Sequence, residues 1–191
     1  PQLISGEAED VAFELREFSD LSSAEIIDML RKKTGLLLRF AAESGVMVAL
    51  GVDDHLHPDV KNLGDFAETV GLAFQLQDDV LGMFADEAKL GKPVGSDLRQ
   101  GKRTYLFAKA LELVGDEERM SLLNTLANPN GTAEEMKGVT DLLISSGALS
   151  AVEDEIKRYK ADADSLLTSY PDSTYTSFLL KWSDFACTRS Y

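Results

Sequence analysis

The segment FQLQDDVL, residues 74–81, lies within a long run of apolar residues that recur every three or four positions. This spacing predicts one helix over residues 58–84. On such a helix Gln75, Asp78 and Asp79 share one face, because they stand at i, i+3 and i+4. Two adjacent carboxylates repel each other, and a divalent cation removes this repulsion. Ligands that are all oxygen favour Mg²⁺, which keeps water and phosphate oxygens in its shell.

The alternative interpretation of these carboxylates is a solvated acidic patch, in a chain with 33 acidic and 19 basic residues. Residues 88–104, AKLGKPVGSDLRQGKRT, favour the cation site instead, although an ordinary solvated loop would also contain lysines. Between residues 89 and 103 five basic residues accompany a single acid, Asp97. Glycines let the backbone approach a ligand, and lysines pair with phosphate. Acids on a helix followed by a basic loop therefore predict a ligand that is both metal-bound and anionic, namely a diphosphate.

The remainder of the chain also has the periodicity of helices. Capping boxes at Ser22 and Thr132 predict helix starts, and the first helix should extend through Arg39 towards residue 49. Residues 86–103 are expected to form a loop, and further helices are predicted at 104–114, 149–167 and 174–189. Trp182 and Phe185 should pack in the core. With no alternating strand pattern and no repeat, the predicted fold class is all-α.

Composition restricts the class of protein and of partner. A chain of 191 residues with 44% hydrophobic residues can bury one core, so we expect a single domain, 1–191. The net charge of −14 argues against nucleic acid and anionic membranes as partners. No apolar stretch is long enough for stable membrane insertion. The lone cysteine, Cys187, excludes an internal disulfide and predicts a reducing, cytoplasmic location.

Four segments in their order resemble a known family. Residues 74–81 and 91–102 together resemble the second aspartate-rich region of the trans-isoprenyl diphosphate synthases, or polyprenyl synthetases. Residues 33–35, Lys-Thr-Gly, resemble the Lys-Thr pair of that family, and residues 5–10, SGEAED, resemble its Gly-Gln-x-x-Asp element. The ending at 189–191 is also similar. The resemblance spans the whole chain, and it is most specific over the two aspartate-rich and basic segments.

The resemblance implies a fold and an activity. The fold would be an antiparallel helix bundle around a deep central cavity, and the enzyme would be a homodimer. It would condense isopentenyl diphosphate with an allylic diphosphate, with Mg²⁺ as cofactor, to give a farnesyl- or geranylgeranyl-class product of short or medium chain length. One alternative is a noncatalytic or split subunit of such an enzyme. Another is a class I terpene cyclase, against which the Gly-Lys-Pro-x-Gly-Ser-Asp-Leu segment argues.

The same resemblance gives roles to five charged residues. Asp78 would share a Mg²⁺ with the allylic diphosphate, and Asp79 would support that metal site. Lys33 and Lys92 would bind the same diphosphate. Lys102 would join them from a closing loop. The resemblance therefore implies an ionised diphosphate neutralised by both a metal ion and lysines.

By the same resemblance, two further residues would stand beside the reacting carbons. Thr34 and Gln75 are expected to act with Lys33 in catalysis, and Asp10 would hold Lys33 or metal-bound waters near the diphosphate.

Three features depart from the family pattern. Gly82 stands where the family has a third aspartate, and Glu7 stands where the family has glutamine. The first aspartate-rich motif is absent, so we expect amino-terminal helices upstream of this carboxyl-terminal part.

Overall fold

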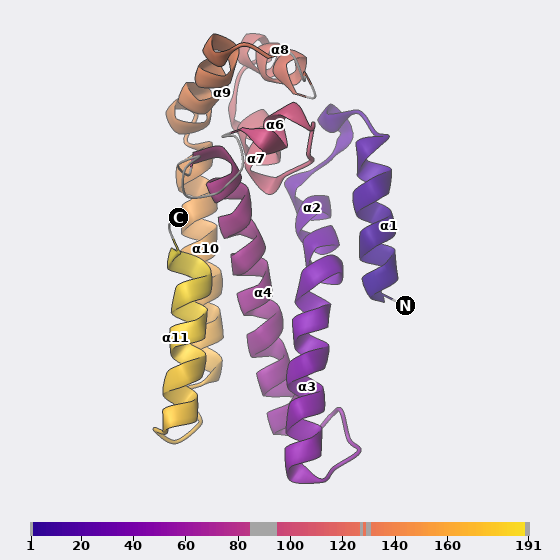
Figure 1. Ribbon diagram of the computed structural model, residues 1–191, viewed down its shortest axis with the longest axis vertical. Helices are drawn as coiled ribbons and strands as arrows, with labels where there is room; N and C mark the ends of the chain where they lie inside the picture. Colours follow the sequence, from indigo (N-terminus) through magenta and orange to yellow (C-terminus); the bar gives the residue numbers. More distant parts are fainter. Residues whose placement is uncertain (1, 85–94, 127, 129–130, 190–191) are drawn as a thin grey trace.

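The computed structural model describes residues 2–84, 95–126, 128 and 131–189. Within these residues the chain is helical and contains no strand, which confirms the all-α class (Figure 1). The elements in chain order are α1 (Gln2–Glu14), the 3₁₀ turn η1 (Phe18–Asp20), α2 (Ser23–Leu30), the π-helical turn η2 (Arg31–Gly35), α3 (Leu36–Leu50), α4 (Pro58–Phe84), α6 (Ser96–Arg99), α7 (Tyr105–Leu113), α8 (Asp116–Thr125), α9 (Ala133–Ser145), α10 (Ala148–Leu166) and α11 (Thr174–Thr188).

The predicted helix boundaries are confirmed where caps or prolines mark them. Helix α4 covers the predicted residues 58–84. Ser22 caps α2, since its Oγ accepts from Glu25 N at 3.2 Å while Glu25 Oε2 accepts from Ser22 N at 2.9 Å. Thr132 caps α9 in the same way. From α2 the helix continues through η2 and α3, with a π-helical turn that the periodicity did not predict.

Three of the described helices were not predicted. Helix α6 lies within residues 86–103, which were expected to form a loop. Helices α1 and α8 were missed because each buries very little. Gly6 and Phe13 are the buried residues of α1, and Leu122 is the one buried residue of α8. Too few apolar positions repeat to give a helical pattern. Helix α8 instead begins with three acidic residues, which interact favourably with the positive end of the helix dipole.

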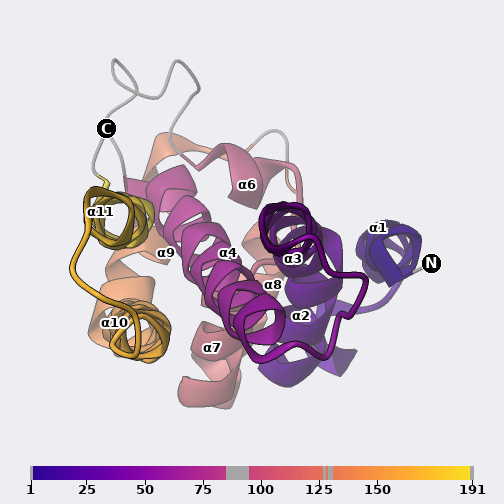
Figure 2. The same cartoon turned by 90° about the horizontal axis from the view of Figure 1, so that it is seen from below.

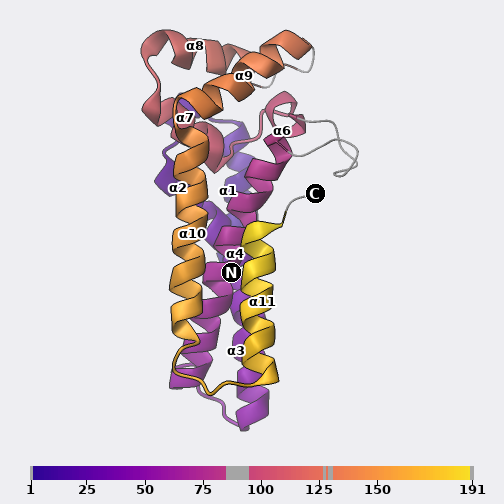
Figure 3. The same ribbon diagram turned by 90° about the vertical axis from the view of Figure 1, so that its left-hand side faces the viewer.

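Helix α4 lies at the centre of the molecule. It packs against α3 and η2 on one side and against α10 and α11 on the other (Figure 2). Two connections at one end of the molecule, between α3 and α4 and between α10 and α11, make these neighbours antiparallel (Figure 3). Helices α6 to α9 gather at the opposite end, beyond the carboxyl end of α4. The end of α4 therefore lies where most of the other elements meet.

One connected core joins buried residues from α1 through α11. Trp182 packs edge-on against Phe66 with ring centroids 5.8 Å apart, as predicted. The prediction for Phe185 was wrong, since this residue is 54% exposed. Ser183, Ala186 and Cys187 take the buried face of α11 instead.

Three wider expectations are not tested by this structure. The single domain over residues 1–191, the deep central cavity and the upstream helices all stay predictions. Among the described residues, none of the helices combines the length and the apolar character that crossing a bilayer requires.

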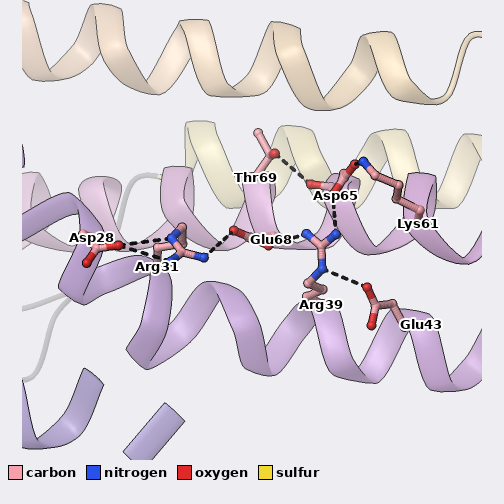
Figure 4. A network of polar contacts seen from close by, with 8 residues as sticks. All are labelled: Asp28, Arg31, Arg39, Glu43, Lys61, Asp65, Glu68 and Thr69. Atoms are coloured by element: carbon pink, nitrogen blue, oxygen red, sulfur yellow. Dashed lines mark hydrogen bonds and ion pairs between the residues drawn. The ribbon is translucent and has the colours of Figure 1, made fainter. Parts of the chain in front are cut away.

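An ionic network joins α3 to α4 (Figure 4). The Arg39 guanidinium donates to Glu43 Oε1 at 2.8 Å and to Asp65 Oδ1 at 2.5 Å, and it also bonds Glu68. Arg31 approaches the other oxygen of Glu68 at 3.5 Å. The side chains of Arg39 and Glu68 are only 23% and 14% exposed. Removing one partner of such a network leaves the others desolvated without compensation.

Replacing Arg39 with methionine should therefore lower the free energy of unfolding by about 1–3 kcal/mol, because Asp65 and Glu68 lose their shared cation. Urea unfolding at neutral pH measures this change. Arg158→Met is the matched control, since Arg158 is 52% exposed and its pairs with Glu155 and Asp162 lie on the surface of α10. The control should cost no more than about 1 kcal/mol. Equal losses for both variants would contradict the role given to Arg39.

Candidate functional site

A small hollow at the carboxyl end of α4 collects most of the residues singled out in the sequence. Its volume is about 80 Å³. The residues that line it are Asp10, Met29, Leu30, Lys33, Gln75, Asp79, Lys102, Arg103 and Thr104. They come from α1, α2, η2, α4 and the segment that leads into α7. Five predicted site residues distant in sequence therefore meet at one place, namely Asp10, Lys33, Gln75, Asp79 and Lys102.

Lys33 is held by carboxylates of α1. Its Nζ lies 2.5 Å from Asp10 Oδ2 and 3.5 Å from Glu7 Oε2, and the contact with Asp10 is one of the two that the resemblance implies for that residue. Glu7, which departs from the family pattern, thus adds a second acid to the same lysine. Partial burial lowers the pKa of Lys33, but the contact with Asp10 outweighs this and raises the pKa above its usual value. The ammonium group is therefore charged at neutral pH.

The position of Lys33 depends on two local features of the backbone. The π-helical turn η2 turns two successive lysines towards α1, where Lys32 Nζ lies 2.7 Å from Glu9 Oε1. Helix α1 reaches the backbone of this turn through Gly6, because a Cβ atom there would lie 2.5 Å from Lys33 N. Only a glycine permits this approach. Interruptions of this π-helical kind are often found at functional sites.

The structure does not place every predicted residue at the hollow. Thr34 is half-buried in η2 and is not among the residues that line the hollow. Lys92 lies outside the described residues. Their predicted contacts with the reacting carbons and with the diphosphate stay predictions.

Asp79 is the buried carboxylate of the pair. Its residue is 7% exposed, and Oδ2 accepts from Tyr105 N at 3.2 Å. The pKa of Asp79 is raised to about 7, chiefly by burial and to a smaller extent by the nearby charges of Asp97 and Asp78. Lys102 and the Tyr105 N–H act in the opposite direction. A cation placed beside this carboxylate would remove much of the cost of its ionisation.

Asp78 faces a different neighbour. It is not among the residues that line the hollow, and its carboxylate pairs with the guanidinium of Arg189 at the end of α11. The side chain of Asp78 is 47% exposed, whereas that of Arg189 is 4% exposed. Burial raises the pKa of Asp78, and Arg189 opposes this rise. Gln75 and Asp79 therefore share the predicted surface, whereas Asp78 pairs with Arg189 and does not line the hollow.

The sequence analysis gave no role to Asp97, although it is the only acid among the five basic residues of its segment. Its Oδ2 accepts from Lys102 Nζ at 3.2 Å. A Cβ atom on Gly82 would lie 2.7 Å from the same oxygen. The Asp97 carboxylate thus fills the space beside Gly82, at the position where the resemblance places a third aspartate. Being the lone acid in a basic segment was the signal that could have identified it.

The donor groups fit a divalent cation that is shared with an anionic ligand. Among the described residues no three acidic, histidine or cysteine side chains form a metal-binding cluster. A cage built from protein ligands alone is therefore not formed there. Asp78 is half-exposed and already paired with Arg189. Burial raises the pKa of Asp79, so a cation beside Asp79 would favour its ionised form. Mg²⁺ commonly binds through one or two carboxylates, with water and substrate phosphates completing its shell.

Known proteins resemble this chain over most of its length. Residues 1–143 match the family model described as polyprenyl synthetase. Geranylgeranyl diphosphate synthase of Sulfolobus acidocaldarius is 38% identical over 161 residues, which cover 84% of this chain and 47% of the relative.

Solved structures agree with the sequence relatives. Geranylgeranyl pyrophosphate synthetase of Pyrococcus horikoshii superposes with a TM-score of 0.88 at 31% identity, over 99% of this chain and 55% of that one. Polyprenyl synthase of Caulobacter crescentus, complexed with calcium and isoprenyl diphosphate, gives 0.86 at 30% identity, over 100% of this chain and 56% of that one. The chain therefore spans about half the length of these relatives.

The burial of Asp79 predicts a pH-dependent stability. On folding, the pKa of the Asp79 carboxyl group rises from 3.8 to about 7. This shift stabilises the folded state fully below about pH 4, and the stabilisation is lost as the pH rises through about 7. Asp79→Asn keeps an acceptor for Tyr105 N–H and removes this dependence. The advantage of the variant in free energy of unfolding should grow by about 2 kcal/mol between pH 5 and pH 8.

Urea unfolding in EDTA at the two pH values measures this growth, with Asp141→Asn on the exposed face of α9 as the matched control. An advantage of the same size at both values would contradict the raised pKa of Asp79.

Proposed function

Because this chain belongs to the polyprenyl synthetase family, we propose that it is the carboxyl-terminal part of a trans-prenyltransferase that condenses isopentenyl diphosphate with an allylic diphosphate. The product would be a short- or medium-chain polyprenyl diphosphate of the farnesyl or geranylgeranyl class. We propose Mg²⁺ as its cofactor, a homodimer as its assembly and the cytoplasm as its location. The observation that carries the proposal is the meeting of Asp10, Lys33, Gln75, Asp79 and Lys102 at one hollow.

The charges of this site suit the ionisation of an allylic diphosphate. Breaking the allylic C–O bond leaves negative charge on the diphosphate, which preorganised cations stabilise. Lys33, kept charged by Asp10, supplies one such cation, and Lys102 supplies another from across the hollow. When bound through Asp78 and Asp79, Mg²⁺ would neutralise further charge on the departing diphosphate.

The remaining residues of the hollow suit the carbocation that is left. Met29 and Leu30 are buried and apolar, and they help to exclude water, which would otherwise capture the cation. The Gln75 side chain presents an amide dipole to the same space. Thr34 and Lys92 retain their proposed contacts with the reacting carbons and the diphosphate. Among the described residues that line this hollow there is no histidine, and we propose that the final proton goes to the departing diphosphate.

The two alternatives make different predictions about these residues. A noncatalytic subunit has no need of diphosphate-binding cations, yet Lys33 and Lys102 are present and Lys33 is fixed by an ion pair. A class I terpene cyclase would consume an allylic diphosphate without isopentenyl diphosphate. The relatives with the stated identities are named as polyprenyl or geranylgeranyl synthases, and one of them is complexed with a divalent cation and isoprenyl diphosphate.

A prenyl-transfer assay of the complete enzyme tests the proposal, since this chain spans about half the length of its relatives. Labelled isopentenyl diphosphate is supplied with geranyl or farnesyl diphosphate, in Mg²⁺ or in EDTA, and elongated products are expected only in Mg²⁺. Asp78→Ala should lower kcat by about a hundredfold or more, because charge on the departing diphosphate loses its metal-bound counter-charge.

Asp154→Ala is the matched control, since Asp154 is 71% exposed on α10, and it should retain the parent turnover. The absence of any product from the complete enzyme in Mg²⁺ would favour the noncatalytic subunit. Consumption of the allylic substrate without isopentenyl diphosphate would favour the cyclase.

A further inference from the structure

We propose that Arg189 is an internal counter-ion that competes with a divalent cation for Asp78, so that cation binding detaches the end of α11 from α4. This inference rests on the proposed function in one respect, since it takes Asp78 as a ligand of that cation.

The Arg189 side chain is fixed on α4 by several contacts at once. Its guanidinium lies over the Phe74 ring, 3.5 Å from the centroid, and Nη2 donates to Phe74 O at 3.1 Å. The same group pairs with the Asp78 carboxylate. Only 4% of the side chain is exposed. An exposed surface arginine would have none of this enclosure, so the pair with Asp78 is part of the folded structure.

The backbone of Arg189 is attached to α4 as well. Gln77 Nε2 donates to Arg189 O at 3.0 Å, and Arg189 N donates to Phe185 O at 3.1 Å within the last turn of α11. Phe74, Gln77 and Asp78 lie in the same stretch of α4. The final residues of α11 are therefore held to the helix that carries the proposed metal ligand.

The Asp78 carboxylate cannot serve both cations fully. The guanidinium is charged at every pH at which the protein is folded. A divalent cation on the same carboxylate would repel it, and the repulsion is strong because water is largely excluded from the arginine side chain. Asp78 is 47% exposed, so a cation can approach it from solvent while Arg189 contacts it from the protein side. Binding of the cation therefore weakens the bond that holds the end of α11.

The direction of the effect separates this role from simple packing. If Arg189 only stabilised the shape of the site, replacing it would loosen the site and weaken cation binding. If Arg189 competes for Asp78, replacing it with glutamine frees the carboxylate and removes a repelling charge. Both consequences tighten cation binding.

The experiment measures binding of Mn²⁺ alone by electron paramagnetic resonance, and counts only the binding that Asp78→Asn removes. Arg189→Gln should tighten this binding by about tenfold, since a charge-assisted hydrogen bond no longer competes. Arg189→Lys, which keeps the cation, should stay closer to the parent than to the glutamine variant. Arg158→Gln removes an exposed arginine of α10 as the matched control and should change nothing.

Hydrogen exchange gives a second readout on the parent chain. Addition of Mg²⁺ should speed exchange of the amides of residues 186–189, and Asp78→Asn should abolish this response. Thermal unfolding confirms that every variant is folded. Binding that is unchanged or weaker in Arg189→Gln, while Asp78 still accounts for part of it, would overturn this inference alone. Binding that Asp78→Asn leaves intact would instead overturn the metal site of the proposed function.

Discussion

The two adjacent carboxylates at the end of α4 need positive charge or N–H donors beside them, to the extent that the fold removes them from water. Asp79 is nearly inaccessible to solvent, and Tyr105 N, at the first turn of α7, donates to it. Asp78 is met by Arg189 of α11. These partners belong to elements far apart in sequence. The two adjacent carboxylates of α4 therefore help to fix where α7 begins and where α11 ends beside α4. Burial raises the pKa of Asp79 despite Lys102 and Tyr105 N, so a further cation beside this carboxylate would favour its ionised form.

The other half of the site reaches α4 through close backbone contact. Gly6 lets α1 lie against the π-helical turn η2, which brings Asp10 to Lys33. Gly82 leaves room for Asp97, whose carboxylate holds Lys102 beside the hollow. Both lysines are thus held by carboxylates before any ligand is bound. Cations that are already held in place need little rearrangement to stabilise an anion. This preorganisation suits the stabilisation of a departing diphosphate.

Much of the fold could be predicted from local signals, and the rest depends on contacts across the chain. The boundaries of α4 and the capped starts of α2 and α9 follow from residues that act on their own backbone. Helices α1 and α8 bury too little to give a pattern. The pairing of Arg189 with Asp78, 111 residues apart, had no local signal. The family resemblance pointed to Asp10, Lys33 and Asp79, which line the hollow, because members of a family share contacts between residues distant in sequence. It also pointed to Thr34, which does not line the hollow.

The central claim is that the end of α4 binds an anion through a divalent cation. Calorimetric titration with inorganic diphosphate, in Mg²⁺ and then in EDTA, tests it most directly. Binding is expected in Mg²⁺ and should be abolished by EDTA, because Asp78 and Asp79 then have no metal ion to bridge them to the anion. Binding of equal strength in both conditions, or none in either, would contradict it.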